Sequence, residues 1–281
     1  MKRKLKFIII SSLILIFIAI FVLVIVENNM VQINSYTVAS NKLNADFNLK
    51  IAQISDFHNS KKLLDKTVQN VSDSAPDIIV ITGDLIDSRK TNLEIATNLL
   101  EKISKIAPCY YVSGNHEARI KSEYDLLKEK ISDFNVTILE NESVELNVGN
   151  EKINLIGLTD PRFNYESDSK KKACEQIHSD LAPLIKQDMY NLVLCHRPEA
   201  FAEYTALSAD LVLSGHAHGG QIILFGIGAV APNQGIFPKY IKGMYKDKNT
   251  TMVVSRGIGN SLFPFRLNNK PEVVEITLKG E

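Results

Sequence analysis

The segment Ile78–Asp84 reads Ile-Ile-Val-Ile-Thr-Gly-Asp. It begins as an unbroken run of β-branched apolar residues and ends in a glycine and a carboxylate. Such a run, bounded by turn residues, is typical of a buried strand, so we predict one over Asp77–Thr82. The acidic residue that follows would then sit just beyond the end of a strand inside the core.

Similar apolar runs recur along the chain and alternate with helical patterns. Strands are predicted at 50–54, 77–82, 110–113, 137–139, 144–148, 153–158, 192–195, 211–214, 252–255 and 273–278, and helices at 61–74, 92–106, 122–134 and 169–187. Residues 147–150 have the composition of a hairpin turn. Strands and helices alternate in the first half, and consecutive strands are added in the second. This order predicts a layered α/β fold with mixed sheets, and a purely parallel doubly wound sheet is the alternative.

The N-terminus has the composition of a membrane span. Four basic residues within the first six precede an apolar run of 20 residues, Phe7–Val26. About 20 helical residues cross a bilayer core. A cleaved signal peptide would be shorter and would end in small residues, which the run does not, so an uncleaved anchor is favoured over residues 1–26. The positive-inside rule places the N-terminus in the cytoplasm and the rest of the chain outside. Residues 27–35 are predicted to be a tether, and residues 36–281 one globular domain.

Charge and cysteine content narrow the class of protein. The 32 basic and 32 acidic residues give a net charge of zero, so long nucleic acid is not an expected partner. Three cysteines without a close pair argue against a disulfide framework. Cys109 and Cys195 lie in strand-like runs and are predicted to be buried thiols.

Five of the six histidines lie in short segments that each follow a predicted strand. The segments are Asp56-Phe57-His58, Gly83-Asp84, Gly114-Asn115-His116-Glu117, His196 and Gly215-His216-Ala217-His218. Residues just past the carboxyl ends of strands converge in one crevice of an open α/β sheet. Carboxylate, imidazole and amide oxygen together suit Mn, Fe, Zn or Co. We therefore predict two adjacent divalent metal ions, an arrangement that can activate water and hold a phosphoryl oxygen.

The ordered set of these motifs resembles the calcineurin-like metallophosphoesterase superfamily. The resemblance implies two mixed sheets flanked by helices and a phosphoester hydrolase. It implies one metal held by Asp56, His58, Asp84 and His218, and a second held by Asp84, Asn115, His196 and His216. Satisfied turn residues and helix caps are the competing interpretation of each position taken alone.

Other residues near the motifs are given supporting or substrate-binding roles. His116 is the candidate to stabilise the transition state or protonate the leaving oxygen. Asp87, paired with Arg89 or Arg119, and Glu117, which could orient His116 or occupy a first helical turn, are predicted supporting residues. Asp160, Arg197 and Arg256 are candidates to border the cleft or contact phosphate.

A narrower resemblance concerns the substrate. Gly215–Gln221, Pro232–Gly235 and Ser255–Asn260, together with the N-terminal span, are similar to bacterial membrane-associated phosphoesterases, a group that includes UDP-2,3-diacylglucosamine hydrolases. The apolar stretch Ile222–Ala231 is either a further buried strand and turn or a wall for an acyl chain or the bilayer surface. We therefore expect a membrane-anchored phosphoesterase whose substrate belongs to the cell envelope and is lipid-linked.

Two alternative functions and one conflict remain open. A nuclease or nucleotide phosphodiesterase would use the same site on another substrate. A non-catalytic metal-binding scaffold would keep the fold without turnover. Finally, nucleotide-sugar lipids are made on the cytoplasmic face, so that substrate conflicts with the predicted orientation of the domain.

Overall fold

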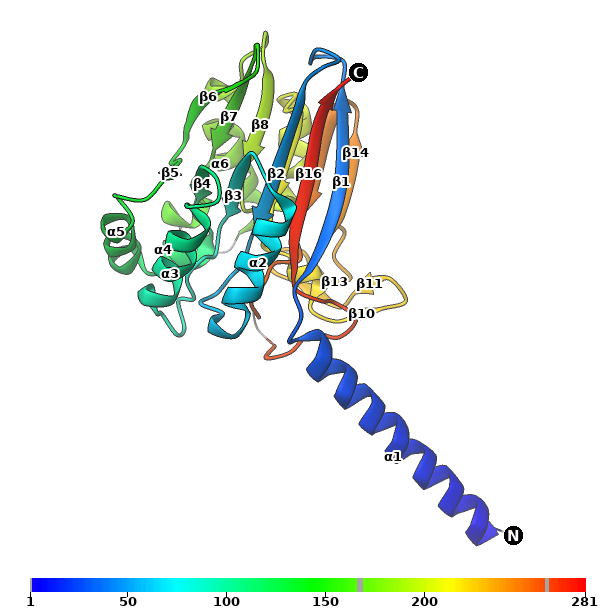
Figure 1. Cartoon of the computed structure of the whole chain (residues 1–281). Coiled ribbons are helices and arrows are strands. Elements are labelled where there is room, and N and C mark those ends of the chain that lie inside the picture. Colours follow the sequence, from blue (N-terminus) through cyan, green and yellow to red (C-terminus); the bar gives the residue numbers. More distant parts are fainter. Residues whose placement is uncertain (1, 166–168, 261–262) are drawn as a thin grey trace.

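Two six-stranded sheets face each other and helices cover their outer sides in the computed structural model, which describes residues 2–165, 169–260 and 263–281 (Figure 1). This arrangement confirms the predicted fold of two mixed sheets flanked by helices. The remaining described strands form two short hairpins within residues 223–236. In the sequence these hairpins lie between two strands of the second sheet, at 211–214 and 243–247.

The first sheet has the strand order β1-β16-β2-β3-β4-β5. Its strands are β1 (Gln32–Ser40), β16 (Glu272–Gly280), β2 (Asn48–Ile54), β3 (Ile78–Thr82), β4 (Cys109–Val112) and β5 (Val136–Ile138). Strands β2 to β5 run parallel to one another, whereas β16 runs antiparallel to β2. The outer face is covered by α2 (Leu64–Ser74), α3 (Leu93–Ile103) and α5 (Lys121–Lys130), with η1 (Lys61–Leu63) leading into α2.

The second sheet has the strand order β14-β15-β9-β8-β7-β6. Its strands are β14 (Gly243–Asp247), β15 (Thr250–Val254), β9 (Leu211–Ser214), β8 (Tyr190–Leu194), β7 (Glu151–Gly157) and β6 (Glu142–Val148). The four central strands run parallel and both edge strands run antiparallel. Helices α6 (Lys170–Leu181) and α7 (Phe201–Ala206) pack on the outer face.

The core between the sheets consists of aliphatic side chains from both inner faces. Ile51, Val80 and Val112 from the first sheet belong to one cluster with Leu155, Leu192 and Leu213 from the second, and all six are buried. This dry interior fixes the two sheets against each other. The loops after β2, β3, β4, β8 and β9 are thereby held at one end of the sandwich.

Helix α1 (Lys2–Glu27) leaves the domain at that same end (Figure 1). Strand β1 begins there, because Gln32 pairs with Glu272 in parallel register and Gln53, near the end of β2, pairs with the neighbouring Val274. The apolar part of α1 is not buried against the domain, and its length and mean hydropathy of 3.4 are sufficient to cross a membrane. One N-terminal helix of this chain could therefore span a bilayer.

Several element boundaries differ from the predictions. Residues 27–35 were expected to be irregular, whereas β1 begins at Gln32 and leaves only residues 28–31 between α1 and the sheet. The helix predicted over 169–187 ends at Leu181, because Pro183 interrupts it and a short 3₁₀ turn, η3 (Ala182–Leu184), follows. The short strands β10 (Ile223–Leu224), β11 (Ile227–Gly228), β12 (Val230–Ala231) and β13 (Gly235–Ile236) form hairpins rather than one buried strand.

Candidate metal centre

The predicted ligands lie on five loops that each follow a parallel strand. Asp56 and His58 follow β2, Asp84 follows β3, and Asn115 opens the short helix α4 (Asn115–Arg119) after β4. His196 follows β8, and His216 and His218 follow β9. All seven side chains are buried.

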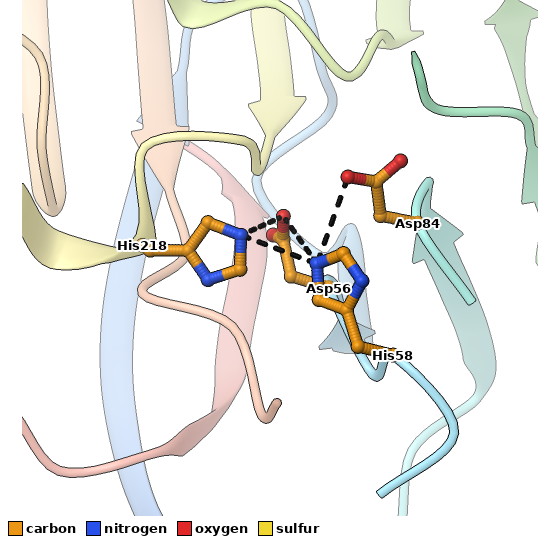
Figure 2. A group of neighbouring side chains, drawn as sticks. All are labelled: Asp56, His58, Asp84 and His218. Atoms are coloured by element: carbon orange, nitrogen blue, oxygen red, sulfur yellow. Dashed lines mark hydrogen bonds and ion pairs between the residues drawn. The ribbon is translucent and has the colours of Figure 1, made fainter. Parts of the chain in front are cut away.

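Four of these side chains converge in a first cluster, which Figure 2 shows. Asp56, His58, Asp84 and His218 each offer one ligand atom, and these atoms lie within 4.8 Å of one another. His218 Nε2 is 3.1 Å from Asp56 Oδ1 and 3.2 Å from His58 Nε2. His58 Nε2 is in turn 3.7 Å from Asp84 Oδ2. Two imidazole nitrogens and two carboxylates thus face one point.

Asp84 also belongs to a second cluster, with His196 and His216. His196 Nε2 lies 3.3 Å from Asp84 Oδ2 and 3.1 Å from His216 Nδ1. His196 Nδ1 donates to the carbonyl of Thr82 at 2.7 Å, which directs Nε2 into the cluster. Asp84 is therefore the residue shared by both clusters.

The donor set fits divalent metal ions. Neighbouring imidazole nitrogens 3.1–3.2 Å apart, aimed at carboxylates, are arranged as ligands around a cation. The amide oxygen of Asn115 is buried and has no hydrogen-bond partner among the described residues, which leaves it free for such an ion. The protein thus holds a histidine and aspartate cluster compatible with two metal ions.

The charges within the clusters shift the acidity of their members. Burial by itself disfavours the carboxylate of Asp84, but His196 and His116 hold its pKa well below the usual range. Burial also disfavours the imidazolium of His196, yet Asp84 outweighs it and raises the pKa of His196 to about 10. For His58, burial prevails and lowers the pKa to about 3.

His116 lies beside the first cluster, and its ring is fixed from one side. The backbone N–H of Ser88 donates to His116 Nδ1 at 3.0 Å, so the ring proton is on Nε2, which faces Asp84 at 4.0 Å. Asp87 Oδ1 is 3.4 Å from His116 Nδ1. The Arg89 guanidinium donates to the Asp87 carboxylate at 2.8 and 3.0 Å. This is one of the two pairings predicted for Asp87.

Glu117 supports the loops rather than the His116 ring. Its buried carboxylate accepts backbone N–H groups from Asp84 at 2.9 Å, Gly114 at 2.7 Å and Ile86 at 3.0 Å. These bonds tie the loop after β3 to the loop after β4. Of the two roles open to Glu117, the contacts match the second. It lies in the first turn of α4, where its carboxylate accepts from the N–H of Gly114 at the start of the helix, and its printed bonds go to backbone N–H groups of the loops.

The structure does not present the three candidate substrate contacts as free groups. Arg197 is buried, with two bonds to Asp160 at 2.6 and 2.8 Å, and its guanidinium also lies 3.1 Å from His216 Nε2. Arg256 faces Glu272, with Nε 3.3 Å from the carboxylate. Asp160 and Arg197 thus border the second cluster as a buried ion pair, and a phosphate contact by any of the three stays a prediction.

Two residues near the clusters were missed by sequence reasoning. Arg266 is fully buried, and its guanidinium lies 3.3 Å from His218 Nδ1. Asn233 Oδ1 is 3.4 Å from His216 Nε2. Asn233 lies in the Pro232–Gly235 segment, so the resemblance held a signal for it. Arg266 reaches the site only through the tertiary fold, and no local pattern marks it.

The sequence of this chain matches a known family of phosphoesterases. The family model for calcineurin-like phosphoesterases matches residues 49–220, more than half of the chain. The chain therefore belongs to the calcineurin-like phosphoesterase family, and it is a metallophosphoesterase with a candidate dimetal site.

Individual relatives agree with this assignment. The chain is 29% identical over 270 residues to the metallophosphoesterase YkuE of Bacillus subtilis (strain 168), an alignment covering 90% of this chain and 87% of YkuE. It is 26% identical over 236 residues to the phosphodiesterase YaeI of Escherichia coli (strain K12), covering 82% of each. Its fold is similar to that of TT1561 of Thermus thermophilus, with a TM-score of 0.51 and 14% identity, covering 75% of this chain and 91% of that one.

Proposed function

We propose that this protein is a membrane-anchored hydrolase of a lipid-linked phosphoester or pyrophosphate of the cell envelope, and that it uses two divalent metal ions. The observation that carries the proposal is the pair of buried clusters that share Asp84. In our assignment Asp56, His58, Asp84 and His218 hold one ion, and Asp84, Asn115, His196 and His216 hold the other. Bound there, the two ions would activate water and polarise the phosphoryl oxygens.

His116 is the proposed catalytic residue of the chain itself. Its Nε2–H faces the shared carboxylate, while the backbone N–H of Ser88 holds Nδ1 on the opposite side of the ring. A donor held this way can stabilise charge on a phosphoryl oxygen or give its proton to the leaving oxygen. Asp87 would then be a positioning residue, because its bonds to Arg89 brace the turn whose Ser88 N–H holds the His116 ring.

The membrane part of the proposal rests on α1 and on its junction with the domain. Asn28 follows α1 directly, and its side chain donates to the Arg266 carbonyl and accepts from the Arg266 N–H, both at 2.8 Å. Arg266 also lies beside His218, so this single residue connects the end of α1 to the first cluster. A metal centre linked to the end of a membrane helix suits a substrate whose phosphate lies near the bilayer.

The orientation and the precise substrate are further parts of the proposal. The basic residues before the span favour a cytoplasmic N-terminus and an extracytoplasmic domain. Protease protection of the domain in inverted vesicles checks this orientation. An extracytoplasmic domain favours an envelope lipid over a nucleotide-sugar lipid such as UDP-2,3-diacylglucosamine, which would be reached from the cytoplasmic side.

Hydrolysis of model esters tests the catalytic claim. The detergent-solubilised full chain, reconstituted with Mn, Zn, Fe or Mg, is assayed on bis-p-nitrophenyl phosphate and p-nitrophenyl phosphate. We expect metal-dependent turnover, with kcat reduced about 10²–10⁴-fold by His116→Ala. Unchanged kcat in His116→Ala would remove its proposed role. No turnover with any ester or with lipid phosphates, despite two bound ions, would favour the non-catalytic scaffold.

A further inference from the structure

Large apolar side chains are exposed on the two hairpins that follow the last metal motif. Phe225 is fully exposed at the tip between β10 and β11, and Ile236 and Phe237 on β13 and just beyond it are 75% and 72% exposed. We call this set the hairpin surface, and its members are Leu224, Phe225, Ile227, Ile236 and Phe237. Exposed apolar clusters of this kind mark a site of contact with another apolar phase.

The hairpin surface and α1 are fixed to the same short segment. The N–H of Ile223 donates to the Leu267 carbonyl at 3.0 Å, and Asn268 Nδ2 donates to the Ile223 carbonyl at 3.1 Å. The adjoining Arg266 carries the two bonds to Asn28 at the end of α1. Figure 1 shows β10, β11, β13 and α1 at one end of the domain. A bilayer crossed by α1 would therefore lie against the hairpins.

Both hairpins are also joined to the metal centre. The first emerges from η5 (His218–Gly220), where a Cβ on Gly220 would approach Gly228 Cα to 2.6 Å, so the chain is closely packed at its base. The turn of the second hairpin places Asn233 Oδ1 at 3.4 Å from His216 Nε2. Whatever covers the hairpin surface is consequently held beside the two clusters.

We propose that the two hairpins insert into the interfacial layer of the bilayer that α1 spans, and thereby seat the metal centre at the level of the lipid headgroups. This inference rests on the proposed membrane anchoring of the chain and deepens it, because it identifies the phosphate of a membrane lipid as the group within reach. Aromatic and aliphatic side chains at the tip and an exposed lysine, Lys239, just after Phe237 are the pattern of an interfacial anchor.

The absence of tryptophan from the sequence permits a direct test. Full-length Phe225→Trp and Phe237→Trp variants are reconstituted into vesicles of phosphatidylcholine and phosphatidylglycerol, with or without bromine on the acyl chains. We expect blue-shifted emission that brominated lipid quenches several-fold. The matched control is Asn150→Trp, in the exposed turn between β6 and β7 at the opposite end of the sandwich, and it should emit as in water and stay unquenched.

The possible outcomes separate the inference from the proposed activity. Emission from both hairpin variants that matches Asn150→Trp would overturn the insertion, even if the protein hydrolyses phosphoesters. Shielded emission without lipid quenching, accompanied by energy transfer between labelled copies, would assign the surface to a second copy and also overturn it. Quenching by lipid supports the insertion whether or not turnover is found, because the signal does not depend on hydrolysis.

Discussion

Five of the seven proposed metal ligands adopt left-handed backbone conformations. Asp56, His58, Asp84, His216 and His218 all have φ between 47° and 68°. Such conformations cost about 1–3 kcal/mol each and persist where the surrounding structure fixes them. These conformations turn each side chain off its strand toward the shared centre.

His196 gives a prediction for the pH dependence of metal binding. Its pKa is raised to about 10 by Asp84 despite burial, so in the metal-free protein the ring is protonated at pH 7. A metal ligand must be neutral, and binding therefore releases this proton. Affinity should rise with pH up to the raised pKa. Calorimetric titration with Zn in buffers of different ionisation enthalpy should show release of about one proton more than for His196→Asn. Equal release by the two proteins would contradict this expectation.

The glycines that precede the ligands show how far a sequence argument reaches. A sharp turn off each strand would explain glycine at 83, 114 and 215, but of these three only Gly83 has a positive φ, of 89°. Gly114 has a φ of −109°, and Gly215 is not in the left-handed region either. Their reason is proximity: an added Cβ would lie 2.3 Å from Asp84 Oδ1 or 1.8 Å from Ser55 Oγ. That crowding comes from neighbouring loops and is not visible in the local pattern.

At the scale of elements, the loops after β3 and β4 are joined through Glu117. In the native protein three backbone N–H groups donate to this carboxylate. Replacing Glu117 with Gln would place a side-chain NH₂, which is a donor, against at least one of these donors. We expect Glu117→Gln to lower the free energy of unfolding by about 1–3 kcal/mol and to reduce metal content. Urea unfolding measures the first and elemental analysis the second. The exposed Glu129→Gln on α5 is the control and should stay within about 0.5 kcal/mol of the parent. Equal stability of the two variants would refute this role.

Burial decides which elements could be predicted. Strands β2, β3, β8 and β9 are almost wholly buried, and their apolar runs identify them within a few residues. Strand β1 is half exposed and polar, and β14 is an exposed edge, so neither carries a pattern distinct from that of a loop. The short hairpins from β10 to β13 are apolar without being core, which is why the sequence left their role open.

Across the molecule, helix α1, the two ligand clusters and the hairpin surface lie at one end of the sandwich. The ligand motifs could be found from the sequence because they follow buried strands in order. Their supports could be found only in part. Asp160 and Arg197 were predicted to border the cleft, but their pairing and the contact of Arg266 with His218 arise only from the fold. The tie between Asn28 and Arg266, 238 positions apart in sequence, likewise arises from the fold alone.

Counting bound metal tests whether Asp84 is shared by two metal ions. The purified full chain is loaded with Mn or Zn, freed of excess metal and analysed by mass spectrometry beside Asp84→Asn and Asp87→Asn. We predict about two ions per chain for the parent and for Asp87→Asn, and about one or fewer for Asp84→Asn, because a neutral amide cannot bridge two cations. Two ions retained by Asp84→Asn, or none bound by the parent protein, would contradict the account.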